Sequence, residues 1–317
     1  MSDIKLFRVG GEKVSELAGA AAQVEKSLQE MFETNLEALL GVRFLVSEYS
    51  TGPVHGGRID TLGLDEDNSP VIIEYKRAVN ENVINQGLFY LDWLLDHRKD
   101  FQWVVLEQLG PDVAKAVDWS APRLLCVAGE FTHHDKYAVK QIARNIQLMR
   151  YRRFGDELLM LELVHTPKTV RGSPPSHLRN GRGDSAPDEA QHSVADPYWT
   201  NRMSYRLSQA STELKDLYEA LQQFLIGLGD DVQVKELKQY TAFKRIKNFT
   251  CLQIYPQARS VVAYLRLDPV TVDLEDGYSR DVSSIGHHGT GDLELSLKSM
   301  ADFERAQPLL RKAYEGG

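Results

Sequence analysis

The chain has 317 residues, a formal net charge of −8, 42 % hydrophobic residues and 26 % charged residues, a composition typical of a globular protein with room for two domains. The negative charge argues against a protein that coats nucleic acid indiscriminately, although local basic surfaces remain compatible with it. No apolar run approaches the ~18 residues of a membrane span, the first residues lack a signal-peptide pattern, and only two cysteines occur. These features predict a cytoplasmic protein with no disulfide framework, no zinc cluster and no membrane partner.

The first predicted element is a helix over residues 15–40. Four apolar residues at helical spacing form a stripe that should face a sheet: Leu28, Phe32, Leu36 and Leu39. Glu25 falls on this stripe, where a carboxylate is costly unless it is paired or bound to a metal. Glu33 belongs to a separate acidic stripe that favours a solvated face, and it is the main alternative to Glu25 as the buried carboxylate.

Two strand-like runs follow at residues 58–64 and 70–76, with a polar turn at 65–69 between them. Enrichment in apolar and β-branched residues on both sides of a polar turn predicts an antiparallel hairpin. Folding the hairpin about the centre of the turn pairs Leu62 with Ile72.

The same register places Asp60 opposite Glu74, with Cβ atoms roughly 4.5–5.5 Å apart. Lys76 projects to the same face as Glu74, because side chains alternate along a strand. Opposed like charges destabilise a hairpin unless something compensates them, and a divalent cation beside an ammonium does so. The alternative is a pair of solvated acids, but the unbroken apolar run 71–73 is typical of a strand covered on both faces. The hairpin therefore predicts a metal site.

Residues 80–97 are predicted to form a helix, on which Gln86 and Tyr90 lie four residues apart on one face. Further elements are expected in the order strand, strand, helix, strand, at residues 101–106, 123–128, 134–149 and 157–164. Strands that alternate with helices predict an α/β layer.

Asp60 with Glu74-Tyr75-Lys76 resembles the motif of the PD-(D/E)xK nuclease superfamily. Gln86 and Tyr90, as a Gln-x-x-x-Tyr after the lysine strand, are a mark of its RecB-like branch. Residues 29–95 look like the NucS-like endonucleases, and the resemblance covers roughly the first half of the chain. It implies a restriction-endonuclease-like core, which is a mixed sheet with helices on both faces.

The resemblance also implies roles for these residues. Asp60 and Glu74 would hold Mg²⁺ or Mn²⁺ together with Glu25, the carboxylate that this superfamily often contributes from its first helix. Lys76 would orient the attacking water or stabilise the transition state. The glutamine and tyrosine of the following helix would support the lysine and contact the DNA backbone.

The predicted helix 134–149 carries a basic residue at every fourth position: Lys136, Lys140 and Arg144. This row is either a surface that contacts phosphates or an ordinary solvated face. Residues 166–200 are rich in Pro, Gly, Ser and Asn and poor in apolar residues, which predicts a flexible linker. The linker would separate a nuclease-like domain at 1–165 from a second domain at 201–317.

The second domain is expected to be a smaller α+β unit, with helices and strands at 212–228, 249–255, 261–267, 293–297 and 300–314. Its segments KQYTAFKRIKNF and RDVSSIGHHGTGD resemble an uncharacterised C-terminal module that has been labelled a predicted transport protein domain. Lys244 lies among aromatic residues, a combination suited either to nucleic acid or to a core with a solvated edge. Asp281, His287 and Asp292 mark a glycine-rich loop that either binds a ligand or is simply a turn.

These patterns together predict a two-domain, Mg²⁺- or Mn²⁺-dependent endonuclease that hydrolyses DNA phosphodiester bonds, in DNA repair or in defence against foreign DNA. Two alternatives stay open: a nucleic-acid-binding protein that does not cut, and a ligand-sensing regulatory protein on a nuclease-like fold. The C-terminal domain leaves room for a homodimer or a partner protein.

Overall fold

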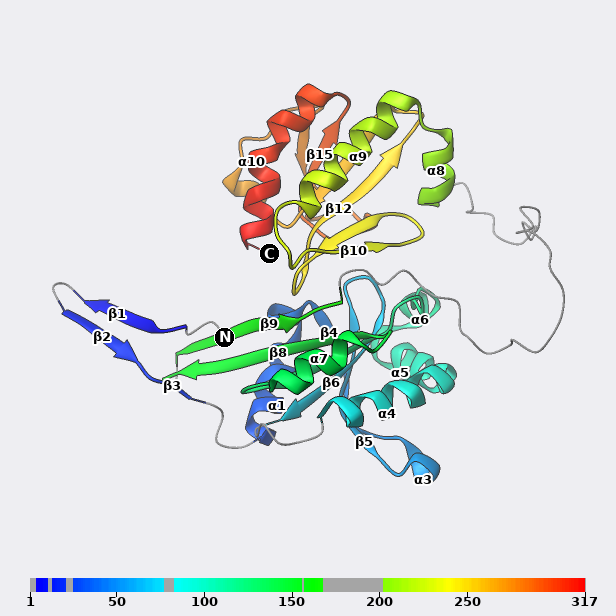
Figure 1. Ribbon diagram of the computed structural model, residues 1–317. Helices are drawn as coiled ribbons and strands as arrows, with labels where there is room; N and C mark the ends of the chain where they lie inside the picture. The colour runs from blue at the N-terminus through cyan, green and yellow to red at the C-terminus, as the bar shows by residue number, and fades with distance from the viewer. Residues whose placement is uncertain are drawn as a thin grey trace. The chain divides into compact units, whose positions relative to one another are not determined.

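The computed structural model describes residues 4–10, 13–20, 25–76, 83–155, 157–167 and 202–316. The chain divides into two compact units, Met1–Pro167 and Lys168–Gly317, and each is built around its own sheet (Figure 1). The predicted linker lies outside the described residues except at positions 166 and 167.

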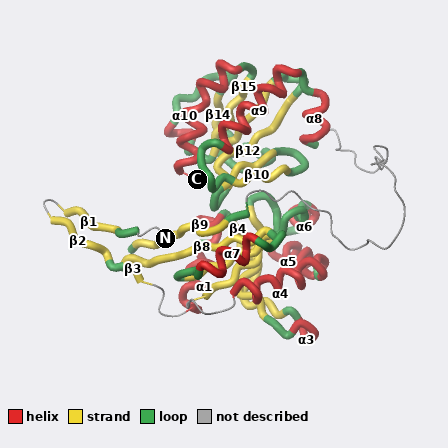
Figure 2. Tube along the Cα trace, in the orientation of Figure 1, coloured by secondary structure: helices red, strands yellow, loops and turns green. Residues whose placement is uncertain are grey.

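The first unit contains a seven-stranded mixed sheet with the order β3-β8-β7-β6-β5-β4, and β9 pairs with β8. Its strands are β3 (Gly19–Ala20), β4 (Val42–Ser50), β5 (Arg58–Asp65), β6 (Pro70–Lys76), β7 (Arg123–Ala128), β8 (Asn145–Phe154) and β9 (Leu158–His165). The central strands β6, β7 and β8 are parallel, whereas the outer pairs are antiparallel. β1 (Leu6–Gly10) and β2 (Lys13–Leu17) form a separate two-stranded ribbon (Figure 2).

Helices cover both faces of this sheet. They are α1 (Glu25–Thr34), α2 (Leu36–Leu40), α3 (Gly52–His55), α4 (Val83–Asp96), α5 (Arg98–Leu109), α6 (Pro111–Lys115) and α7 (His133–Lys140). Leu62 and Ile72 belong to the core cluster that includes residues of α4 and α5. Tyr75 instead contacts Phe32 of α1, with ring centroids 5.6 Å apart. Because neighbouring residues of a strand point to opposite faces, α1 and α4 lie on opposite sides of the sheet.

β5 and β6 form the hairpin that the sequence predicts, and Leu62 pairs with Ile72 as expected, so the register is confirmed. Asp65 closes the turn, because its Oδ1 accepts hydrogen bonds from the backbone N–H groups of Asp67 and Ser69 at 3.0 and 2.8 Å. A side chain that bonds the backbone two and four residues ahead fixes a tight turn and, with it, the register of both strands.

The first predicted helix is too long at its N-terminal end. Residues 13–20 are strands, and α1 begins only at Glu25. Gly19 explains part of this error in the predicted helix. It pairs with Phe154 of β8 so closely that a Cβ at position 19 would lie 2.9 Å from Cε1 of Phe154. The apolar stripe is confirmed at Leu28, Phe32 and Leu36, which are all at most 2 % exposed, whereas Leu39 is half-buried.

Two further predictions in this unit are wrong. Residues 101–106 belong to helix α5, in which Phe101 and Val105 are buried four residues apart while Trp103 is 60 % exposed. The helix expected over 134–149 ends at Lys140, and the chain then enters β8. Pairing of β8 with β7 and β9 overrides the helical pattern there, because tertiary contacts outweigh intrinsic propensity.

The second unit has a six-stranded antiparallel sheet with the order β10-β11-β12-β13-β15-β14. The strands are β10 (Gln233–Glu236), β11 (Thr241–Lys244), β12 (Asn248–Tyr255), β13 (Ser260–Leu265), β14 (Ser279–Asp281) and β15 (Leu293–Leu297), with helices α8 (Met203–Gln209), α9 (Thr212–Ile226) and α10 (Met300–Gly316). The five elements predicted from the sequence are present; β10, β11, β14 and α8 were missed. The fold class, a mixed α/β unit followed by a smaller α+β unit, is confirmed.

No helix in the described part of the chain is long and apolar enough to cross a membrane.

Gly87 tests how closely α4 packs on the sheet. An alanine normally stabilises a helix interior by about 1 kcal/mol relative to glycine, but a Cβ at Gly87 would lie 2.5 Å from Cδ1 of the fully buried Leu124. Gly87→Ala should therefore lower the melting temperature of the first unit, because overpacking costs about 1–3 kcal/mol. Asn85→Ala, at an exposed position of the same helix, is the matched control in a thermal melt. A Gly87→Ala protein as stable as the parent would contradict this packing.

Candidate active site

The candidate site lies where β5 and β6 separate. The ladder between these strands ends at the pair Thr61–Ile73. Beyond this point β5 continues along β4, and β6 continues in parallel along β7 to Lys76. The two strands therefore form a fork, and Asp60 and Glu74 are the first residues inside it.

Each carboxylate at the fork accepts a hydrogen bond from the backbone of the opposite strand. The Asp60 N–H donates to Oε1 of Glu74 at 3.2 Å, and the Tyr75 N–H donates to Oδ2 of Asp60 at 3.0 Å. Side-chain oxygens thus accept the backbone hydrogens just past the end of the ladder. Glu74 is fully buried and Asp60 is half-buried, so the two acids are held close together in a partly enclosed place.

Helix α1 supports the fork from one side. Gln29, which is 7 % exposed, donates from Nε2 to the backbone carbonyl of Asp60 at 2.9 Å and to Oγ of Ser47 at 3.1 Å. Oε1 of Glu33 also lies within hydrogen-bond distance of this nitrogen, at 3.0 Å, so three acceptors share its two hydrogens. The Thr61 hydroxyl donates to the same oxygen of Glu33 at 2.5 Å. Glu33 therefore faces β5 and is half-buried, in contrast to the solvated position expected for it.

Helix α4 supports the fork from the other side through the predicted pair. The Tyr90 hydroxyl accepts hydrogen bonds from the backbone N–H of Arg58 at 3.1 Å and from Nε2 of Gln86 at 3.3 Å. The close approach of the ring requires Gly57, because a Cβ there would lie 2.5 Å from Cε1 of Tyr90. Gln86 and Tyr90 thus position the start of β5, two residues before Asp60.

The acids of the fork impose a negative field on their neighbours. Burial raises the pKa of the Tyr75 phenol. Its hydrogen bond with Thr61 lowers this pKa by less than burial raises it, and the charges of Glu33, Asp60 and Glu74 each raise it by a smaller amount. Burial likewise raises the pKa of the Cys126 thiol, with Glu74 as the next contribution. Both groups are therefore neutral at physiological pH. A neutral, buried thiol is not a nucleophile, so Cys126 is not a candidate for nucleophilic chemistry.

Lys76 is the last residue of β6 and is half-buried. It pairs in register with Ala128 of β7, two residues after Glu74 pairs with Cys126. Alternation along the strand places its side chain on the same face as that of Glu74. The three residues of the predicted motif are therefore gathered at one end of the fork.

The other predicted ligand, Glu25, is the first residue of α1, and its side chain lies outside the described residues. Its assignment stays a prediction. Elsewhere in the first unit, Lys140 and Arg144 are exposed and Lys136 is half-buried, but Arg144 lies between α7 and β8. The helical row expected for the three basic residues is therefore interrupted after Lys140.

The predicted residues of the second unit differ in exposure, and none of the described ones belongs to a metal-binding group of three or more side chains. Lys244 is buried with 5 % exposure, so its ammonium is not on the surface where it could contact phosphates. His287 stacks on the ring of Tyr264 at 4.2 Å between centroids. Asp281 and Asp292 are exposed, and hydrogen bonds from Ser283 lower the pKa of Asp281. The loop packs back on the sheet.

The donor set at the fork fits a small hard cation. The described residues contain no group of three or more His, Cys, Asp or Glu side chains that could hold a metal. Mg²⁺, however, usually binds proteins through one or two carboxylates and completes its shell with water and substrate oxygens. A carboxylate has about four lone-pair positions, so Asp60 and Glu74 can accept a backbone hydrogen and still ligate an ion.

A family model matches the second unit, and a relative matches nearly the whole chain. Residues 203–316 match the model of the family described as Domain of unknown function (DUF5655). An uncharacterized protein of Haemophilus influenzae is 29 % identical over 314 residues, which is 98 % of this chain and 100 % of that protein.

Solved structures are similar to part of the chain. The crystal structure of a repair endonuclease from Pyrococcus abyssi has 20 % identity and a TM-score of 0.27 over 43 % of this chain and 51 % of its own. EndoMS in a dsDNA2 complex has 22 % identity and a TM-score of 0.24 over 45 % and 49 %. The chain thus matches about half the length of these structures. The homodimer that the C-terminal domain left possible is not supported by these comparisons.

Sequence reasoning missed the network of Gln29, Glu33 and Thr61. Gln29 and Glu33 are four residues apart and directly follow Leu28 and Phe32 of the apolar stripe. This spacing places them at the margin of the buried face, which is the signal that could have identified them.

Removal of the Tyr90 hydroxyl tests the support from α4. Tyr90→Phe should lower stability by about 1–3 kcal/mol, because a part-buried backbone N–H at Arg58 loses its acceptor. Tyr137→Phe, whose ring is 66 % exposed, is the matched control and should leave the melting temperature unchanged. Equal effects of the two variants would show that the Tyr90 hydroxyl does not hold β5.

Proposed function

We propose that the first unit is a divalent-metal-dependent endonuclease that hydrolyses DNA phosphodiester bonds, of the NucS-like type that its motif resembles. The observation that carries this proposal is the fork. Asp60 and Glu74 approach closely enough for each to bond the backbone of the other's strand, and Lys76 follows two residues later. Two acids held together beside a lysine are poorly explained as a device for stability, since like charges in proximity repel.

Asp60 and Glu74 would hold Mg²⁺ or Mn²⁺ in this function. When bound, such an ion stabilises charge on the phosphate and lowers the pKa of a coordinated water. Burial of Glu74 strengthens its attraction for a cation, because electrostatic interactions are less screened away from water. The backbone hydrogen bonds fix the direction of both carboxylates before a cation arrives, which reduces the ordering that binding requires.

Lys76 would act on the scissile phosphate. Its ammonium carries three donors and can hydrogen-bond a non-bridging phosphate oxygen or orient the attacking water, where charge develops in the transition state. Gln86 and Tyr90 would keep the start of β5 in place through the backbone of Arg58. Their role is positioning, because the contacts of the Tyr90 hydroxyl are with the protein.

Because DNA is a polyanion, we expect exposed basic residues of this unit to bind it. Lys140 and Arg144 are exposed basic residues of the same unit, and we assign to them contacts with the phosphate backbone, with Lys136 beside them. Such contacts supply affinity without sequence information, so the preferred DNA structure would be determined at the fork or by the second unit. Cleavage of mismatched or branched DNA would indicate a role in repair, and cleavage of foreign DNA would indicate a role in defence.

Isosteric substitutions test the proposal directly. Asp60→Asn and Glu74→Gln keep an oxygen that can accept the backbone N–H but remove the charge, and Lys76→Met removes the ammonium at similar length. Each should slow Mg²⁺- or Mn²⁺-dependent cleavage of labelled duplex, single-stranded, mismatched and branched DNA by about a hundredfold or more. Cleavage without added metal should be absent in the parent protein.

Asp112→Asn and Lys115→Met, both exposed in α6, are the matched controls and should cut at the parental rate. Thermal melts establish that all five variants are folded. Cleavage that persists in Asp60→Asn and Glu74→Gln would contradict the assignment of the fork. A parent protein that binds DNA and cuts none of the panel would favour the non-cutting alternative.

A further inference from the structure

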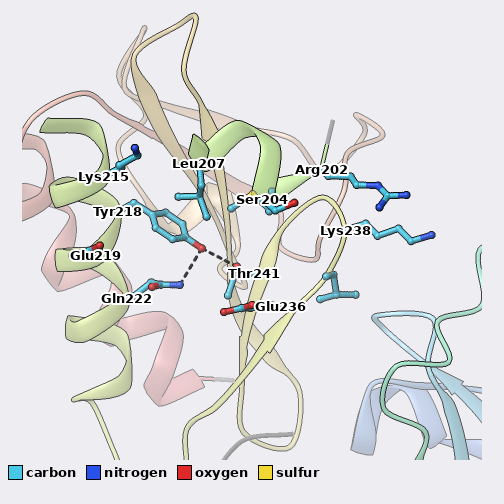
Figure 3. A pocket seen from close by; sticks show the side chains of 12 residues that line it. Arg202, Ser204, Leu207, Lys215, Tyr218, Glu219, Gln222, Glu236, Lys238 and Thr241 are labelled. Carbon is cyan, nitrogen blue, oxygen red and sulfur yellow. Dashed lines mark hydrogen bonds between the residues drawn. The ribbon is translucent and has the colours of Figure 1, made fainter. Parts of the chain in front are cut away.

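A cavity of about 600 Å³ lies in the second unit between helices α8 and α9 and the β10–β11 hairpin (Figure 3). Its volume is within the range of about 300–1,000 Å³ that small-molecule sites occupy. All residues that line it belong to the domain of unknown function or directly precede it. It involves none of the residues of the fork.

Three polar side chains form a connected group inside this cavity. The Tyr218 hydroxyl lies 2.8 Å from Oγ1 of Thr241 and accepts a hydrogen bond from Nε2 of Gln222 at 3.0 Å, as Figure 3 shows. Tyr218 and Thr241 are 3 % and 2 % exposed. Burial raises the pKa of Tyr218 to about 12, so the phenol stays neutral and the group is rigid and uncharged.

Gln222 is the member of this group that can hydrogen-bond a ligand. It is half-buried and uses one amide hydrogen for Tyr218, which leaves its carbonyl oxygen and second N–H. An amide that presents one acceptor beside one donor pairs with the edge of a nucleobase, as glutamine does with adenine. The apolar side chains of Met203, Leu207 and Leu237 also line the cavity and would contact the faces of such a ring.

Charged side chains of both signs line the rest of the cavity. Lys215 and Lys238 have no ion-pair partner among the residues that the structure describes, so their ammonium groups are available to an anion. Glu219 and Glu236 are exposed, and carboxylates at nucleotide sites accept hydrogen bonds from ribose hydroxyls.

We propose that this cavity binds a ribonucleotide, with the base on the Gln222 amide, the ribose hydroxyls on Glu219 or Glu236, and the phosphate at Lys215, which lies on the same helix as Gln222. An amide, a carboxylate and an ammonium match the base, the ribose hydroxyls and the phosphate of a nucleotide in chemistry. A free mononucleotide and the terminal nucleotide of an RNA strand share this chemistry.

The test is calorimetric titration of the full chain, without divalent metal, with AMP, GMP, CMP and UMP. Each nucleotide is compared with its nucleoside, with inorganic phosphate and with a short 5′-phosphorylated oligoribonucleotide. At least one nucleotide should bind saturably, and its nucleoside and phosphate alone should each bind at least about tenfold more weakly, because a charge-assisted contact is lost in each case. Competition between the mononucleotide and the oligonucleotide distinguishes a free ligand from a strand end.

Two matched pairs of variants locate the site. Gln222→Leu should weaken nucleotide binding about tenfold or more, whereas Gln223→Leu, at the next and exposed position of α9, should leave it unchanged. Lys215→Met should likewise weaken binding, whereas Lys298→Met, at an exposed lysine that does not line the cavity, should not. A thermal melt of each variant shows that it is folded.

The outcome is independent of the nuclease proposal, because Lys76→Met should bind the nucleotide as the parent does. No saturable binding of any nucleotide, or equal binding by Gln222→Leu and Gln223→Leu, would overturn the site. Nucleosides that bind as tightly as nucleotides would overturn the assignment of Lys215 to a phosphate.

Discussion

The first unit depends on the pair of carboxylates that accept backbone hydrogens where β5 and β6 part. Past the last ladder pair, Oε1 of Glu74 accepts from the Asp60 N–H and Oδ2 of Asp60 accepts from the Tyr75 N–H. Each strand is then free to follow its other neighbour, β5 along β4 and β6 along β7. The fork therefore holds two acidic side chains near each other, which is unfavourable unless a cation or substrate contributes in return.

Support on both faces keeps this arrangement in place. Gln29 of α1 holds the carbonyl of Asp60, and the Tyr90 hydroxyl of α4 holds the N–H of Arg58. Helices packed on opposite faces thus bond the same short stretch of β5, so the fork is positioned by the cores on both sides of the sheet. Such preorganisation is what a catalytic site needs, because small displacements of its groups cost large factors in rate.

Local patterns predicted part of this structure well. The hairpin register follows from the turn at 65–69 and the paired apolar residues, and the pairing of Leu62 with Ile72 confirms it. The pattern specifies the register strongly, because a one-residue slip would move the apolar side chains of a strand to its other face. The strand expected at 123–128 is β7. The errors at 101–106 and 134–149 arose where apolar residues suit a helix and a strand equally well and only non-local pairing decides. Spacing could have placed Gln29 at the margin of the buried face, but its bonding partners on β4 and β5 and the cavity beside Tyr218 depend on segments distant in sequence.

The most direct test of the account is an anomalous-difference map from crystals of the full chain grown with Mn²⁺. We expect a peak at the carboxylates of Asp60 and Glu74, and its loss in crystals of Asp60→Asn under the same conditions. A fork without a Mn²⁺ peak, while the ion occupies other acidic groups of the chain, would contradict the claim that these carboxylates are held together for a metal.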